Sequence, residues 1–132
     1  MANEWTYLRG PKLDVMCPTE TTITRGTPCY ISSNLLVASG DGNSVDVVCG
    51  KDCVSGDFVP CELPLGAVYL AKAAVGTDFA FGDQVFMAAT STVDAGSAGN
   101  CSTMHVINYN PASGGCLDIS VMSALCAPKI HA

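Results

Sequence analysis

The sequence predicts an all-β fold, a small single-domain β-barrel or β-sandwich with an extended N-terminal arm. Turn signals rich in Gly, Pro, Asn, Asp and Ser recur about every 8 to 15 residues, a spacing typical of short strands in such folds. No window keeps the apolar spacing of an amphipathic helix. The 132 residues fit one domain, which is long enough to bury a stabilising core without disulfides or a bound metal.

The composition favours a protein that assembles with others. Charged residues make up 14% of the chain and hydrophobic residues 48%, whereas about 25% charged residues is usual in soluble domains. Much of the folded surface is therefore uncharged, which suits a molecule covered by partners or by copies of itself. The formal charge of −6 repels phosphate-rich partners, so we expect no nucleic-acid binding.

Residues 1–16 are expected to form an N-terminal arm. Trp5, Tyr7 and Leu8 are large and apolar, and Gly10-Pro11 ends any regular structure there. A segment of this kind either folds back on its own domain or reaches another subunit. The second alternative makes Trp5, Tyr7, Leu8 and Arg9 contact residues, since Trp, Tyr and Arg contribute strongly to binding.

Residues 17–126 are expected to form the β domain, and strands alternate with turns in its first half. We predict strands over 15–17, 28–37 and 45–49, with a turn over 39–44. The segment 54–65 contains Gly56, Pro60 and Pro64, so we expect an edge strand or an irregular connection there.

The central stretch of this domain is Gly66 to Ala88, in which two apolar runs flank a turn-rich segment. Apolar side chains lie on both faces of the first run, and the side chains of Val85 to Ala88 are again apolar on both faces. This pattern is typical of strands buried on both faces, so we expect the two runs to form the middle of a sheet. Their apolar side chains are also candidates for self-association: Tyr69, Leu70, Val85 and Phe86.

Two strands are predicted after this stretch, over 104–109 and 116–122, with loops over 94–100 and 110–115. In the second strand Leu117, Ile119 and Val121 alternate with polar residues, which indicates one buried face and one solvated face. Residues 127–132 are a short C-terminal tail.

The central stretch also resembles a known family. A strand ending in Ala71-Lys72-Ala73, a short Gly-containing gap, Gly82-Asp83-Gln84-Val85-Phe86, and a hairpin closing on Gly99-Asn100 resemble the head-decoration, or capsid cement, proteins of tailed bacteriophages. The resemblance covers roughly residues 45–121. It implies a homotrimer on the outer capsid surface of the virion that binds the major capsid protein and reinforces contacts between its subunits.

A second function keeps the same fold: a β-sandwich module, displayed on a virion, that binds carbohydrate or a host surface. It requires an exposed aromatic platform, and the candidates for one are Trp5, Tyr30 and Tyr109. Exposure of these three side chains on one face favours this function, and their burial favours capsid binding.

The eight cysteines are expected to be thiols, because no signal peptide core precedes the domain and the chain is expected to begin in the host cytoplasm. No apolar run reaches the length of a membrane span, so no membrane partner is expected. Cys49 and Cys53 flank a turn and form the disulfide expected in an oxidising medium.

No metal, cofactor or enzymatic activity is expected. A zinc site of Cys49, Cys53, Cys101 and His105 is disfavoured, because an extended segment holds the last two about 13 Å apart. The loop with Asp41, Asn43 and Asp46 lacks the remaining ligands of a calcium loop. His105 lies inside a predicted strand, Asp83 reads as a turn residue, and no catalytic motif accompanies either.

Overall fold

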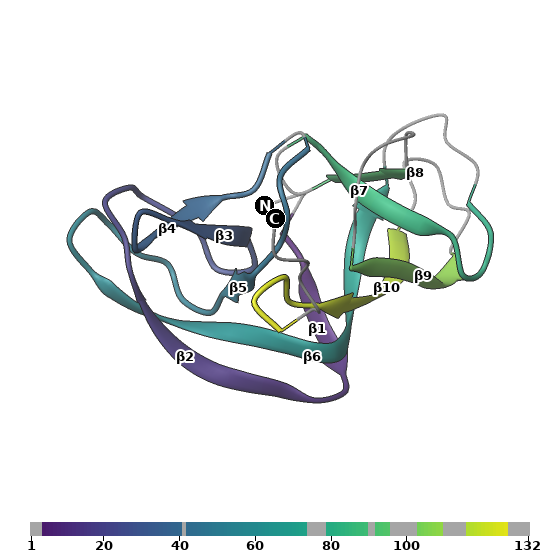
Figure 1. The fold of residues 1–132 in the computed structure, drawn as a ribbon, viewed down its shortest axis with the longest axis horizontal. Helices are drawn as coiled ribbons and strands as arrows, with labels where there is room; N and C mark the ends of the chain where they lie inside the picture. The colour runs from purple at the N-terminus through teal and green to yellow at the C-terminus, as the bar shows by residue number, and fades with distance from the viewer. Residues whose placement is uncertain are drawn as a thin grey trace, which may run out of the picture.

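One long strand, β6 (Phe58–Ala73), runs through both halves of the molecule (Figure 1). The computed structural model describes residues 4–40, 42–73, 79–89, 92–95, 103–109 and 116–126. Every regular element in these ranges is a β-strand, which confirms the all-β prediction. Within them no helix is long and apolar enough to cross a membrane.

The second half of β6 belongs to a closed five-stranded barrel. β10 (Cys116–Met122) pairs with β6, β9 (Met104–Tyr109) with β10, β7 (Gln84–Ala89) with β9, and β8 (Thr92–Ala95) with β7. A short parallel pairing of β8 with β6 closes the circle. The barrel is filled by inward side chains of all five strands, among them Tyr69, Val85, Met87, Val93, Val106 and Ile119.

The first half of β6 belongs to a second sheet. Here β6 lies between β2 (Lys12–Pro18) and β5 (Val47–Cys49), followed by β3 (Pro28–Ser32) and β4 (Leu35–Ala38). The sheet curls until Thr19, just after β2, bridges to Leu36 of β4. Its interior is a second core, rich in sulfur: Cys17, Ile23, Cys29, Leu36, Val47, Cys49, Cys53, Val59 and Cys61.

From Glu4 onward the N-terminal segment packs on the domain, so residues 4–16 form no free arm. Of the two alternatives for residues 1–16, the structure shows the one that folds back on its own domain. β1 (Thr6–Arg9) pairs with the second half of β6 and β2 pairs with the first half. The break at Gly10-Pro11 is the corner between them. Gly10 has φ +99°, and a Cβ there would lie 3.1 Å from the Ala67 Cα, so only glycine fits this turn.

The segment 58–65 is a central part of β6, so the prediction of an edge strand or irregular connection was wrong. Its two prolines stand where partner strands stop. The Pro60 carbonyl accepts from Gly50 N–H just after β5 ends, and the Pro64 carbonyl accepts from Ser123 N–H just after β10 ends. The missing proline N–H groups therefore interrupt neither ladder.

Three further predictions differ from the structure. The segment 28–37 is a hairpin, because Ser33 and Asn34 take positive φ values of 50° and 65°, as two-residue hairpin turns require. The two central runs, β6 and β7, do not pair with each other, because β8 lies between them. The first two residues of the loop predicted over 94–100 belong to a strand, β8 (Thr92–Ala95).

The last two predicted strands are confirmed with the same bounds, as β9 and β10. Leu117, Ile119 and Val121 are fully buried in the barrel, as their alternation predicted. Because adjacent residues of a strand point to opposite faces, this regular alternation needed no knowledge of the partner strands.

Candidate functional site

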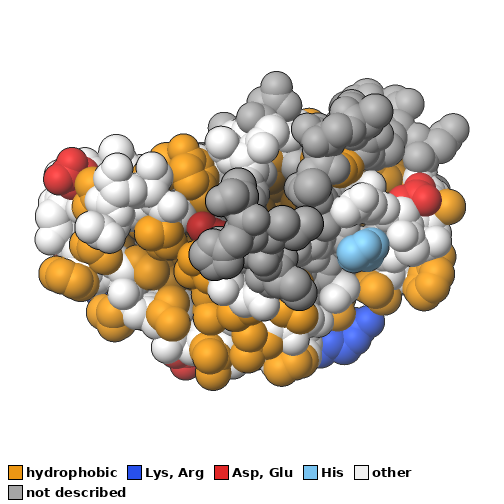
Figure 2. All heavy atoms as spheres, in the orientation of Figure 1, with side chains coloured by type: hydrophobic (Ala, Val, Ile, Leu, Met, Phe, Trp, Pro, Cys, Tyr) orange, Lys and Arg blue, Asp and Glu red, His pale blue; other side chains and the backbone are white. Residues whose placement is uncertain are grey.

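Exposed apolar side chains gather along β1, β2 and the start of β6. In Figure 2 hydrophobic side chains cover much of the lower margin of the molecule, where β2 and β6 run in Figure 1. We call this the β2 surface and define it by three exposed side chains: Leu8, Met16 and Phe58. Large apolar side chains that gather in this way are typical of protein contact sites.

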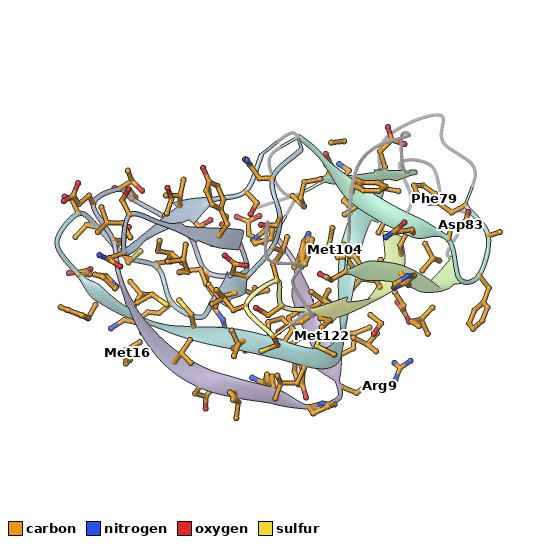
Figure 3. All side chains as sticks on the ribbon, in the orientation of Figure 1. Arg9, Met16, Phe79, Asp83, Met104 and Met122 are labelled. Carbon is orange, nitrogen blue, oxygen red and sulfur yellow. The ribbon has the colours of Figure 1, made fainter. Side chains whose placement is uncertain are left out.

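The strand register places two of these side chains on one face. Met16 lies opposite Pro60, and Pro18 lies opposite Phe58, so Met16 and Phe58 are diagonal neighbours. Met16 is 61% exposed and Phe58 is 69% exposed. In Figure 3 Met16 points away from the body of the molecule, and Arg9 does so near the corner between β1 and β2.

A polar network lies beside the β2 surface, between the two cores. The Lys12 ammonium donates to the Glu62 carboxylate at 2.7 Å and lies 4.4 Å from the centre of the Tyr7 ring. The Tyr69 hydroxyl donates to the other Glu62 oxygen at 2.9 Å. Glu62 raises the pKa of Lys12, whereas the pKa of Tyr69 is raised mainly by burial and further by Glu62.

A pocket of about 480 Å³ opens next to this network. Charged and aromatic side chains from four separate segments line it, including Glu4, Tyr7, Lys12, Arg25 and Glu62. The two acids and two bases give it no single sign of charge.

Of the four predicted contact residues, three are exposed and one is not. Tyr7, Leu8 and Arg9 lie on β1, all four residues of which are exposed. Trp5 is only 4% exposed, which corrects its assignment as a contact residue. Its ring packs 5.9 Å from that of Tyr69, and its backbone N–H donates to the Gly26 carbonyl at 2.8 Å.

Burial of Trp5 also removes it from the aromatic platform that carbohydrate binding would need. Tyr30 is half-buried on β3, in the other half of the molecule, and the Tyr109 side chain lies outside the described residues.

Two of the predicted self-association residues fill the interior of a single chain. Tyr69 and Val85 are fully buried in the barrel, which corrects their assignment to an interface. Leu70 and Phe86 are half-buried and point to the other side of their strands. The apolar character of both sides therefore arises from barrel closure on one side and partial covering on the other.

Cys49 and Cys53 are free thiols in the sulfur-rich core. Cys49 lies directly opposite Cys61 in the β5–β6 ladder, whereas Cys53 pairs with Ile23 through two backbone hydrogen bonds. The spacing of the cysteines indicated Cys49 as a disulfide residue but not Cys61. The pairing of β5 with β6 depends on the fold, which spacing alone does not show.

Within the described ranges no group of three or more His, Cys, Asp or Glu side chains is arranged to hold a metal ion. Cys101 and Asp41 lie outside those ranges, while His105 is exposed on β9. The Asp46 carboxylate accepts from the Ile31 N–H of β3 at 2.9 Å, and the side-chain carbonyl of Asn43 accepts from Gly40 N–H. Both side chains thus bond backbone groups.

Asp83 also has a structural role. Its carboxylate accepts from Ala80 N–H at 2.8 Å, and its own N–H donates to the Ala80 carbonyl. These two bonds close the turn before β7, as the sequence predicted.

Comparison with known proteins finds structural similarity to a phage protein. No protein-family model matches the chain, and no curated protein sequence matches it. The chain is similar to the crystal structure of the N base of head fiber gp8.5 of bacteriophage phi29, with a TM-score of 0.60 and 16% identity. The similarity covers 86% of this chain and 95% of that one, and it shows that the two share a fold.

Proposed function

We propose that the chain is a structural protein of a bacteriophage head that sits on the outer capsid surface as a decoration, or cement, protein. The observation that carries the proposal is the shared fold over nearly the whole of both chains with the base of a phage head fiber. The resemblance of residues 45–121 to phage head-decoration proteins was found independently, from sequence motifs.

We propose that the β2 surface is the part of the described chain that contacts the major capsid protein. Tyr7, Leu8 and Arg9 keep the contact role inferred from the sequence, and Met16 and Phe58 extend it along the sheet. Exposed side chains this large are costly to leave in water, and covering them stabilises a complex.

In this role each copy contacts two or more capsid subunits at once. Pulling those subunits apart under the pressure of packaged DNA then also requires breaking the decoration contacts. Interfaces of standard size, about 1,200 to 2,000 Å² each, suffice when many copies act together. The charge of −6 fits an outer surface, away from DNA.

We also propose that the chain forms a homotrimer and has no catalytic role. Leu70 and Phe86 remain candidates for self-association, because their side chains are half-buried and do not fill the barrel interior. Light scattering after size-exclusion chromatography measures the oligomeric state directly, and a stable monomer at micromolar concentration would contradict the trimer.

The function is tested by co-sedimentation of the purified chain with expanded phage heads that lack a decoration protein. We expect saturable binding with a fixed number of copies per head. Unexpanded proheads are the matched control, because they present a different outer surface. Failure to sediment with either particle would contradict the proposed function.

A further inference from the structure

The sulfur-rich core contains a pair of thiols that face each other across two strands. Cys49 of β5 and Cys61 of β6 are direct partners in the antiparallel ladder, and both are buried. The other described buried cysteines, Cys17, Cys29 and Cys53, lie in the same cluster. Five buried thiols in one core raise the question of which two could be joined.

The backbone hydrogen bonds beside Cys49 and Cys61 show how closely these two side chains approach each other. Gly50 N–H donates to the Pro60 carbonyl at 2.9 Å. This bond joins the residue after Cys49 to the residue before Cys61, so Cys49 and Cys61 form a non-hydrogen-bonded pair. In such pairs the Cα atoms are about 4.5 Å apart and the side chains approach closely, within the Cα range of about 4.4 to 6.8 Å that disulfides adopt.

The two thiols lie close enough to affect each other. The nearby Cys61 thiol is the main cause that lowers the pKa of Cys49, and Cys53 is a lesser one. The Cys49 thiol donates to the Lys51 carbonyl at 3.0 Å. A thiol that ionises more readily than usual is the better attacking group in disulfide exchange near neutral pH.

The neighbouring cysteines are less suited to form a disulfide with Cys49 or Cys61. Cys17 lies opposite Val59, and therefore diagonal to Cys61. Diagonal residues across a ladder are about 7 to 8 Å apart, beyond the usual disulfide range. Cys53 is held by its two backbone bonds to Ile23, and its thiol donates to the Ile23 carbonyl at 3.4 Å.

We propose that Cys49 and Cys61 form a cross-strand disulfide when the protein meets a low-molecular-weight disulfide such as oxidised glutathione. The Cys49 thiolate attacks one glutathione sulfur, forms a mixed disulfide and releases one glutathione thiolate. Cys61 loses its proton, attacks the Cys49 sulfur and releases the second glutathione thiolate. Two protein thiols are oxidised, one small disulfide is reduced to two thiols, and the two protein protons pass through solvent to the released thiolates.

The bond would tie β5 to the strand that both cores share. β5 contributes Val48 to the barrel cluster and Val47 to the sulfur-rich core, so fixing it to β6 holds the two cores together. The thiols stay reduced in a glutathione-buffered cytoplasm and are oxidised outside it. This inference does not depend on the proposed function.

The test is a peptide map of the full chain after incubation with oxidised glutathione and blocking of the remaining thiols. Cleavage before aspartate places the relevant cysteines in separate peptides, Cys49 in 46–51, Cys53 in 52–56 and Cys61 in 57–77. We expect 46–51 joined to 57–77, with the loss of two hydrogen atoms. The Tm should rise by about 10 °C over the reduced protein, because the bond closes a short loop in the unfolded chain.

Single variants supply the controls. Cys49→Ser and Cys61→Ser should each abolish the cross-link and the rise in Tm, whereas Cys126→Ser, at an exposed thiol, should leave both unchanged. The peptide map of the unaltered chain stands even where a serine variant fails to fold. Peptide 46–51 joined to 52–56, or no cross-link in 46–51, would overturn the proposal.

Discussion

The hydroxyl of Tyr69, whose ring is buried in the barrel core, donates a hydrogen bond of 2.9 Å to the carboxylate of Glu62. Both residues belong to β6, on either side of the bend in that strand (Figure 1). The same carboxylate receives the Lys12 ammonium from β2. One acidic side chain therefore joins the barrel to the sheet that carries the β2 surface.

Removing this bond should destabilise the fold without creating a cavity. We expect Tyr69→Phe to lower the free energy of unfolding by about 1 kcal/mol, the usual net value of a hydrogen bond, because Glu62 keeps Lys12 as a partner. Tyr7→Phe is the matched control, since the Tyr7 hydroxyl bonds the Gly10 carbonyl at an exposed position. Urea denaturation measures both, and equal losses would contradict the linking role of Tyr69.

Stability should fall in alkaline solution. The pKa values of Tyr69 and Lys12 are both raised in the folded protein, the first mainly by burial and the second by Glu62. A raised pKa means that the folded state holds the proton more tightly, so this stabilisation is complete below the unfolded values of about 10 and 10.4 and is lost as the pH rises above them.

Spectrophotometric titration of the four tyrosines checks this expectation. Tyr69 should ionise only together with unfolding, and Tyr69→Phe should remove that step. Complete ionisation of all tyrosines while the protein stays folded would contradict it.

Docking of the N-terminal segment is tested at two glycines. Gly26 has φ +87°, and a Cβ there would lie 2.7 Å from the Trp5 carbonyl oxygen. Gly56 has φ +92°, but a Cβ there would meet nothing within 4 Å. Gly56→Ala should cost about 1 kcal/mol through backbone strain alone, whereas Gly26→Ala should cost about 3 kcal/mol or more. Equal losses in chemical denaturation would mean that Trp5 is not docked as described.

The β2 surface should be needed for binding to heads but not for folding. We expect Met16→Glu combined with Phe58→Glu to weaken binding to expanded heads by about tenfold or more, because each charge would be buried at the interface. Phe81→Glu is the matched control, since Phe81 is 78% exposed in the barrel turn before β7. All variants should keep the Tm of the unaltered chain. Unchanged binding by the double variant would exclude this surface.

What the sequence could predict depended on how local each signal was. The alternation of Leu117, Ile119 and Val121 defines a strand without reference to its partners, and it was confirmed. Pro60 and Pro64 suggested an edge, because proline is excluded from central strands unless the neighbouring strands end beside it. Where β5 and β10 end is a property of the fold, which no short window contains.

The candidate site was harder to predict, because its contacts join distant parts of the chain. Lys12 and Glu62 are 50 positions apart, and neither stands in a motif. Trp5 looked like an exposed anchor because the ring it packs against, Tyr69, lies on another strand. The exposure of Met16 and Phe58 follows from the pairing of β2 with β6, which apolar composition alone could not reveal.

The most direct test of the central claim is electron cryomicroscopy of expanded heads with and without the added chain. The account predicts extra density on the outer surface that fits this fold, contacts at least two major capsid subunits and places β2 against the shell. Density confined to the interior or to the tail, or heads that look identical with and without the chain, would contradict it.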